Sequence, residues 1–132
     1  MVQPKVTSKH ADGSIRYLYV DFLADIPANK GAVLEFEKES DGKCEEKGVS
    51  VTQTGQGLCV DTGCVTFTVK NNSQNIFETL DDGRKHYTAQ NFEGPYLKDD
   101  MGLYDINIGE WKIIDAGPVK CCLLYTSDAA DE

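Results

Sequence analysis

The sequence predicts an all-β protein, folded as an antiparallel β-barrel or β-sandwich, and three observations support this. Short runs of β-branched and aromatic residues recur at intervals of roughly 8–12 residues, and glycine-containing turns separate them. No window of about 12 residues shows the apolar spacing of an amphipathic helix. The chain has 132 residues, 40% of them hydrophobic, which is enough for one domain with a core of its own.

The first strong strand is expected over residues 14–22, directly after the turn signal Asp12-Gly13. Side chains alternate between the two faces of a strand. Both faces of this strand are apolar, since one carries Ile15, Tyr17 and Tyr19 and the other Leu18, Val20 and Phe22. Strands with two apolar faces are typically buried on both sides, so we expect this strand to be central and covered.

The remaining strands are expected to be shorter. A half-exposed strand over residues 32–37 follows a turn at residues 27–31, and a tight hairpin covers residues 58–69 with its turn at Thr62-Gly63. A short strand is expected over residues 49–52, and weaker candidates are residues 75–80, 85–89, 103–108 and 110–114. Turns are expected at residues 54–57, 81–83 and 108–110.

The charge balance is acidic and excludes some classes of partner. There are 13 Lys and Arg against 22 Asp and Glu, so the formal net charge is −9. Nucleic-acid binding needs a basic surface, and anionic membranes attract basic segments, so neither partner is expected. No apolar run approaches the ~20 residues of a membrane span, and residues 1–11 lack the apolar core of a signal peptide.

The cysteines do not form a metal-binding pattern. The five are Cys44, Cys59, Cys64, Cys121 and Cys122, and none lies in a CxxC pair. A structural zinc site needs about four ligands in close pairs, and the chain has only two histidines to add. We expect free thiols, with a Cys59–Cys64 disulfide across a hairpin as the alternative. No metal and no cofactor is predicted.

Several polar groups have the chemistry of a functional site, but a structural role is the favoured interpretation of each. Asp21 and Asp25 could act as an acid–base pair, but turn capping explains them better. The carboxylates of Asp99, Asp100 and Asp105 could bind Ca²⁺, although they lack EF-hand spacing. His10 or His86 could pair with Cys59 or Cys64 as in a thiol nucleophile, but nothing in the sequence brings them together. Residues 54–57 are no phosphate loop, since no helix follows.

The remaining candidates for a functional role are six aromatic residues and one arginine. Sugar rings can stack on exposed aromatic side chains, although core packing explains most of those present, which are Tyr17, Tyr19, Tyr87, Tyr96, Tyr104 and Trp111. Arg16 lies on the strand expected to be covered, so we expect it to form an ion pair with Asp21 or Asp61. No catalytic residue is assigned.

The last eleven residues, CLLYTSDAADE from Cys122 to Glu132, look like something other than protein-coding sequence. They resemble the conceptual translation of a common transposon-type sequencing adapter, which gives these residues in order in one reading frame. We therefore exclude residues 122–132 from the fold and expect them to pack on nothing. Without Asp128, Asp131 and Glu132 the net charge falls in magnitude from −9 to −6.

Three segments in order carry a family resemblance: DGSIRYLYVDFLADIPANKGAVLEF from Asp12, GLCVDTGCVTFTV from Gly57 and EWKIIDAGPVK from Glu110. Together they resemble the N-terminal RIFT-barrel domain of the PcRGLX/YetA-like family, which includes exo-acting rhamnogalacturonan lyases. The resemblance covers about residues 3–120. The chain has Tyr17 where the family usually has tryptophan.

The resemblance implies that residues 1–121 are an incomplete β-barrel placed ahead of a large catalytic domain. Met1 is then expected to be internal to a longer protein, and the chain to be cut at both ends. The expected function is that of a non-catalytic accessory domain whose partner is the missing catalytic domain, and not that of an enzyme. The alternative is a stand-alone carbohydrate-binding β-sandwich module with a polysaccharide partner.

Overall fold

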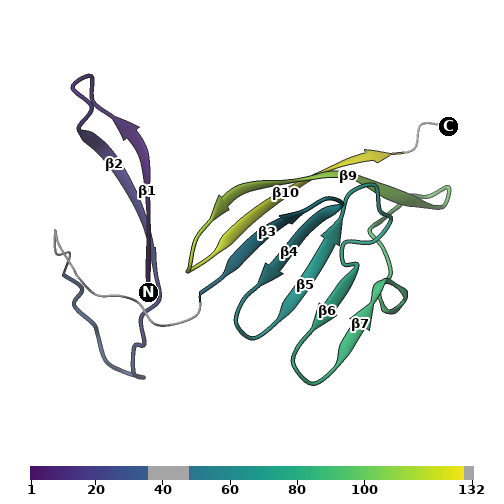
Figure 1. Ribbon diagram of the computed structural model, residues 1–132, viewed down its shortest axis with the longest axis horizontal. Coiled ribbons are helices and arrows are strands. Elements are labelled where there is room, and N and C mark those ends of the chain that lie inside the picture. The colour runs from purple at the N-terminus through teal and green to yellow at the C-terminus, as the bar shows by residue number, and fades with distance from the viewer. Residues whose placement is uncertain (36–47, 130–132) are drawn as a thin grey trace.

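The computed structural model describes residues 1–35 and 48–129, which form β-strands and one turn of 3-10 helix (Figure 1). In chain order the elements are β1 (Val2–Lys9), β2 (Ile15–Phe22), β3 (Ser50–Thr54), β4 (Gly57–Asp61), β5 (Thr66–Lys70), β6 (Thr79–Asp81), β7 (His86–Thr88), η1 (Ala89–Asn91), β8 (Tyr96–Lys98), β9 (Leu103–Ala116) and β10 (Cys121–Ala129). All paired strands are antiparallel. The all-β prediction is confirmed.

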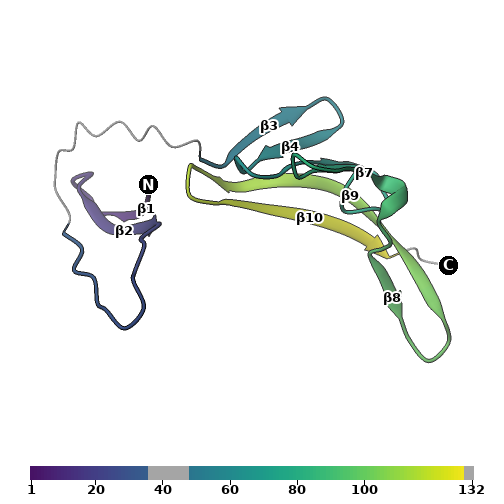
Figure 2. The same cartoon turned by 90° about the horizontal axis from the view of Figure 1, so that it is seen from below.

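The body of the molecule is a pair of sheets packed face to face (Figure 2). One is a five-stranded meander in the order β3-β4-β5-β6-β7, and the other has the order β10-β9-β8. Both cover the cluster of Leu58, Val69, Ile108 and Trp111, which are all at most 9% exposed. The arrangement is sandwich-like, and the described strands do not close into a barrel.

Trp111 ties the two sheets together by polar bonds as well as by burial. Its indole N–H donates to the carbonyl of Lys70 at the end of β5, at 3.2 Å. Its backbone N–H donates to the side-chain oxygen of Asn71 at 3.0 Å. The ring packs on Tyr125 of β10 with ring centroids 5.0 Å apart. The position of β9 across β5 is therefore fixed by both apolar contact and hydrogen bonds.

The central hairpin predicted over residues 58–69 is confirmed as β4 and β5. Its turn is stabilised by Asp61, whose carboxylate accepts from the Gly63 N–H at 2.8 Å. Thr62 closes the turn by accepting from and donating to the backbone of Val65. Alternation then places Val60 and Val69 in the core and Cys59 and Thr68 on the outer face.

The N-terminal strands were predicted wrongly in one respect. β2 pairs only with β1, in a separate two-stranded sheet, so it is neither central nor covered (Figure 1). Tyr17 and Leu18, on opposite faces, are 58% and 49% exposed. Apolar alternation identified the strand, but it could not tell whether other strands lie over its two faces.

Other strand predictions were partly wrong. The segments 103–108 and 110–114 form one strand, β9, and the expected turn at residues 108–110 is instead an irregularity in the pairing with β10, which leaves Gly109 and Glu110 without Cα partners and resumes at Ile108. The strand expected over residues 75–80 is shortened to β6. Residues 32–35 form no strand, and the rest of the segment predicted to residue 37 lies outside the described residues.

The expectation that residues 122–132 pack on nothing is also wrong for the part that the structure describes. Cys121–Ala129 form β10, which pairs with β9 along its length, with two irregularities in register. Leu123 packs against the core cluster and Tyr125 against Trp111. The turn at residues 117–120 brings the segment back along β9. Leu123 and Tyr125 are two residues apart in the strand, so both face the side of the core. The origin of this segment remains a prediction.

Candidate docking site

One face of the β1–β2 hairpin is an exposed apolar surface. The register pairs Val2 with Phe22, Pro4 with Val20 and Val6 with Leu18, so these six side chains share one face, which we call the hairpin apolar face. Val2, Val6, Leu18 and Phe22 are between 42% and 56% exposed. Soluble proteins seldom leave such contiguous apolar surface in water unless it binds something.

The opposite face of the hairpin holds the turn between β9 and β10 through a buried glutamine. Gln3 is 5% exposed, and its side-chain oxygen accepts from the N–H groups of Val119 and Lys120 at 3.1 and 3.0 Å. Its amide nitrogen is buried and has no hydrogen-bond partner among the described residues. A Cβ on Gly117 would clash with the Gln3 side chain, so a glycine is needed for this close approach.

Two ion pairs surround Gln3. The Lys120 ammonium lies 2.9 Å from the Asp21 carboxylate and over the ring of Tyr19, 4.7 Å from its centroid. Lys5 lies 3.4 Å from Asp115. The hydrogen bond to Asp21 raises the pKa of Lys120 above its ordinary value of 10.5, against a smaller opposing effect of burial. These contacts and those of Gln3 form what we call the latch, which attaches the hairpin to the body mainly through polar groups.

A second apolar surface lies at the other end of the molecule, on the hairpin of β8 and the start of β9, which we call the finger (Figure 2). Its apolar side chains are all exposed: Tyr96 (53%), Leu97 (54%), Met101 (88%), Leu103 (60%) and Tyr104 (42%). Asp99 shapes its tip by accepting from the N–H groups of Met101 and Gly102. The finger is therefore an ordered turn with apolar side chains around it.

The aspartates that the sequence offered as acid–base or Ca²⁺-binding groups lie far apart or stabilise turns. The turn capping expected of Asp21 is wrong, because Asp21 lies within β2 and its carboxylate belongs to the latch. Asp25 follows β2 and is exposed. Asp99 caps the finger turn, and Asp105 lies on β9 opposite Tyr96. No group of three or more metal-ligating side chains comes together in residues 1–35 and 48–129. These aspartates thus contribute to turn structure and to the latch.

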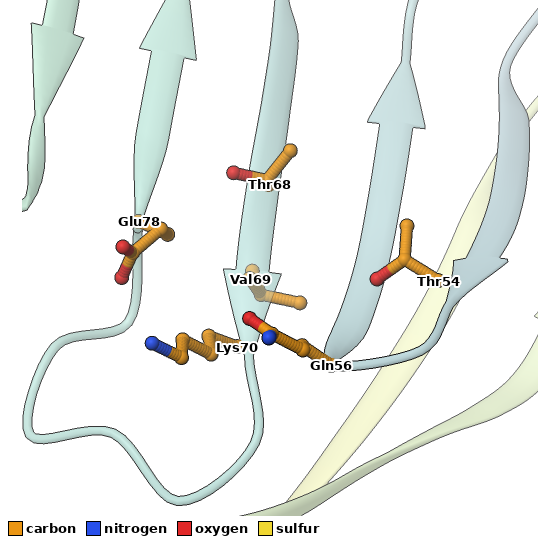
Figure 3. Close-up of a pocket in the computed structure, with 6 residues that line it drawn as sticks. All are labelled: Thr54, Gln56, Thr68, Val69, Lys70 and Glu78. Atoms are coloured by element: carbon orange, nitrogen blue, oxygen red, sulfur yellow. The ribbon is translucent and has the colours of Figure 1, made fainter.

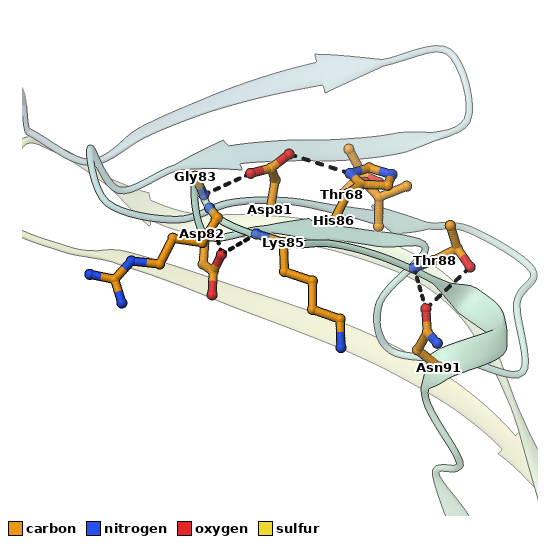
Figure 4. Close-up of polar contacts among 10 residues, drawn as sticks. Thr68, Asp81, Asp82, Gly83, Lys85, His86, Thr88 and Asn91 are labelled. Carbon is orange, nitrogen blue, oxygen red and sulfur yellow. Dashed lines mark hydrogen bonds and ion pairs between the residues drawn. The ribbon is translucent and has the colours of Figure 1, made fainter.

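The two histidines do not meet each other or a thiol. His10 lies at the tip of the β1–β2 hairpin, whereas His86 is on β7, in the body. His86 Nδ1 lies 3.4 Å from the Asp81 carboxylate (Figure 4), and both side chains are at least half exposed. Asp81 is paired with His86 on one side and with Thr66 of β5 on the other, so the three residues form a row across three strands. A hydroxyl nucleophile would need histidine between itself and the carboxylate, but here Asp81 is in the middle.

The neighbouring turn at residues 81–85 is held by carboxylates (Figure 4). Asp81 accepts from the Gly83 N–H, and Asp82 accepts from the N–H groups of Arg84 and Lys85 at 2.9 and 2.7 Å. These backbone hydrogen bonds lower the pKa of Asp82 below its ordinary 3.8. The predicted turn is confirmed, and the acidic groups in it have a structural role.

The described cysteines are all free thiols, as expected, and the alternative Cys59–Cys64 disulfide is absent. Cys44 lies outside the described residues. Cys121 and Cys122 are adjacent at the start of β10, where burial is the main effect that raises the pKa of the Cys121 thiol. A raised pKa makes this thiol a weaker nucleophile at neutral pH.

Arg16 does not pair with Asp21, because Lys120 occupies that carboxylate and Arg16 is exposed. Its guanidinium lies over the ring of Tyr17, 5.2 Å from the centroid. Of the aromatic candidates, Trp111 is core and Tyr87 is half buried against Phe92, as core packing predicts. The expectation that most of the six pack in the core is wrong, because the other four are exposed, namely Tyr17, Tyr19, Tyr96 and Tyr104.

The outer face of the five-stranded sheet has a shallow hollow of about 140 Å³ (Figure 3). Polar side chains make up most of its lining, which consists of Thr54, Gln56, Thr68, Val69, Lys70 and Glu78. Thr68 is hydrogen-bonded across to Thr79 at 2.6 Å, so part of its hydrogen-bonding capacity is already used. A polar, solvated outer face is usual for an antiparallel sheet with one packed face, and the hollow needs no ligand to explain it.

Comparison with known proteins adds no relative: no family model, no curated protein and no solved structure matches the chain. No helix among the described residues is long and apolar enough to cross a membrane.

The sequence analysis missed the latch, since Gln3 is more than a hundred residues away from its partners. Nothing in the local pattern distinguishes Gln3 from an ordinary exposed strand residue.

Proposed function

We propose that the chain is a non-catalytic β-domain that docks onto the rest of a larger carbohydrate-active protein resembling the exo-rhamnogalacturonan lyases. The observation that carries this proposal is the hairpin apolar face, which is exposed on an ordered pair of strands. Two-stranded hairpins are marginal in isolation, so a covering surface would stabilise this one. A second domain of the parent protein is the partner that the resemblance implies.

The proposed function assigns no chemistry to this chain. Lyase chemistry on a uronic acid needs a base for the C5 proton and a cation near the carboxylate. His10 lies at the tip of the β1–β2 hairpin and His86 on β7, and the Lys120 ammonium is paired with Asp21. Incubated with rhamnogalacturonan, the purified chain is expected to form no unsaturated product, as followed by ultraviolet absorbance. Steady product formation would refute the proposal.

The docking itself is tested with the uninterrupted reading frame around this segment. The remainder of that protein, expressed separately, is expected to bind the chain in a pull-down. Leu18→Glu, on the hairpin apolar face, should abolish binding. Leu124→Glu is the matched control, because Leu124 is 51% exposed on β10, and it should bind normally. Equal binding by both variants would rule out this face as the docking surface.

A second candidate function is carbohydrate binding by exposed tyrosines. Tyr17 and Tyr19 are 58% and 51% exposed, and both lie along β2 on the hairpin face opposite the apolar one. Sugar rings can stack on such aromatic surfaces. Affinity electrophoresis in gels containing pectic polysaccharide separates the two functions: retardation that is lost in Tyr17→Ala would favour this candidate.

A further inference from the structure

The finger and the hairpin are complementary in charge as well as alike in exposing apolar side chains. Residues 1–22, the hairpin, contain three Lys or Arg and two Asp or Glu, which gives net +1. The rest of the chain contains ten and twenty respectively, which gives net −10. Within it, residues 93–105 around the finger contain four carboxylates and one lysine, which gives net −3.

The two surfaces lie at opposite ends of the molecule, as both views show (Figures 1 and 2). A single copy therefore cannot bring its own finger onto its own hairpin apolar face. A contact between two surfaces of opposite net charge at opposite ends of the chain is heterologous, which means that each copy contributes a different patch.

We infer that the hairpin apolar face binds the finger of a second copy of this chain, in a head-to-tail contact. The register of β8 with β9 places Tyr96 and Leu103 on one face of the finger together with Asp105. Tyr96, Leu103 and, at the tip, Met101 would cover Val2, Val6 and Leu18 of the hairpin, and all six are at least 42% exposed in the single chain. Lys9 and Arg16 near the hairpin tip would face Asp100 and Asp105 of the finger. The apolar contact supplies affinity, and the charges select the partner.

The charges favour this contact over the symmetric alternatives. Two hairpins face to face would bring together two net-positive segments, and two fingers would bring together two segments of net −3. Like charges placed opposite each other at an interface weaken binding, whereas opposite charges steer association. An anionic membrane is disfavoured for the finger by the same carboxylates.

The inference does not depend on the proposed function. If both hold, a docking domain of the parent protein and the finger of a second copy compete for the hairpin apolar face. A chain that is monomeric but binds the rest of its parent would keep the proposed function and overturn this inference. A chain that self-associates but binds no parent fragment would do the reverse.

Sedimentation velocity of the full chain over a range of concentrations tests this inference. The runs are made in low salt and in about 1 M salt, where the Debye length is only about 3 Å and charge interactions are screened. The weight-average mass is expected to rise with concentration, and to rise less in high salt. Lys9→Glu/Arg16→Glu should weaken association at least about tenfold, and Asp100→Lys/Asp105→Lys should do the same. An equimolar mixture of these two variants should associate again, because every hairpin then meets a finger of opposite charge.

Controls and contrary outcomes are defined by the same geometry. Arg84→Glu and Glu78→Lys change the charge on the five-stranded sheet and the loop before β6, away from both surfaces, and should leave association unchanged. Circular dichroism checks that each variant is folded. A monomer at every soluble concentration would overturn the inference. So would association that the hairpin variant weakens and the finger variant does not, since that result identifies pairing between hairpins.

Discussion

Deleting residues 122–132 should destabilise the protein, because it removes β10 from the sheet. Two losses can be sized from the structure. Leu123 is half buried against the core cluster, which is worth about 1–2 kcal/mol for a partly buried leucine. The contact between Tyr125 and Trp111, with centroids 5.0 Å apart, adds about 0.5–1.5 kcal/mol. The free energy of unfolding is therefore expected to fall by about 1.5–3.5 kcal/mol, before any loss of strand hydrogen bonds.

Urea denaturation followed by circular dichroism and by fluorescence measures this loss. Trp111 is the single tryptophan of the chain, so its emission reports directly on the site of the missing strand. A truncated chain with unchanged stability, within the ~0.5 kcal/mol of neutral surface changes, would refute the reasoning. That result would support the sequence-based expectation that this segment packs on nothing.

Two adjacent leucines provide a matched control that does not shorten the chain. Leu123 faces the core, whereas Leu124 is 51% exposed on the other face of β10. Leu123→Ala should cost about 1–2 kcal/mol and Leu124→Ala less than about 0.5 kcal/mol. Equal effects would mean that β10 does not lie on β9 in the observed register.

Three further predictions concern the latch and the core. Gln3→Ala should leave two backbone N–H groups unpaired and speed hydrogen exchange in the hairpin, at a cost of about 1–3 kcal/mol, whereas exposed Gln53→Ala should change neither. Ile108→Ala, at a fully buried position, should lower the free energy of unfolding by about 2–5 kcal/mol in urea titrations. From neutral pH up to 10.5 the Lys120–Asp21 pair should be intact, and it should be lost as the pH rises through the raised pKa of Lys120; in NMR titrations Asp21→Asn should shift the Lys120 midpoint down.

The sequence predicted the parts of the fold that depend on local pattern. The β4–β5 hairpin is predictable because Val65, Phe67 and Val69 alternate with Thr66 and Thr68 after a short turn at Thr62-Gly63. Turn chemistry and alternation are both properties of neighbouring residues. The all-β class follows from the same local signals, repeated along the chain.

The sequence could not predict what covers each strand. β2 has the alternation of a doubly buried strand, but its two faces have different surroundings, with the latch on one and solvent on the other. Register and coverage depend on residues far away in the chain, such as the Val119 and Lys120 partners of Gln3. The ion pair of Arg16 with Asp21 failed for the same reason, since it assumed a burial that the fold does not supply.

The hairpin also shows how the site and its stability are linked. Among the described residues, the contacts that attach it to the body are mainly polar: two N–H donors on Gln3 and the ion pairs of Lys5 and Lys120. Exposed ion pairs contribute little, so most of the free energy that could hold the hairpin remains unused on its apolar face. Any partner that covers this face, whether a docking domain or a finger, therefore stabilises the strands that it binds. Binding and ordering of the hairpin should accordingly be coupled, and the latch sets how much of that ordering exists before the partner arrives.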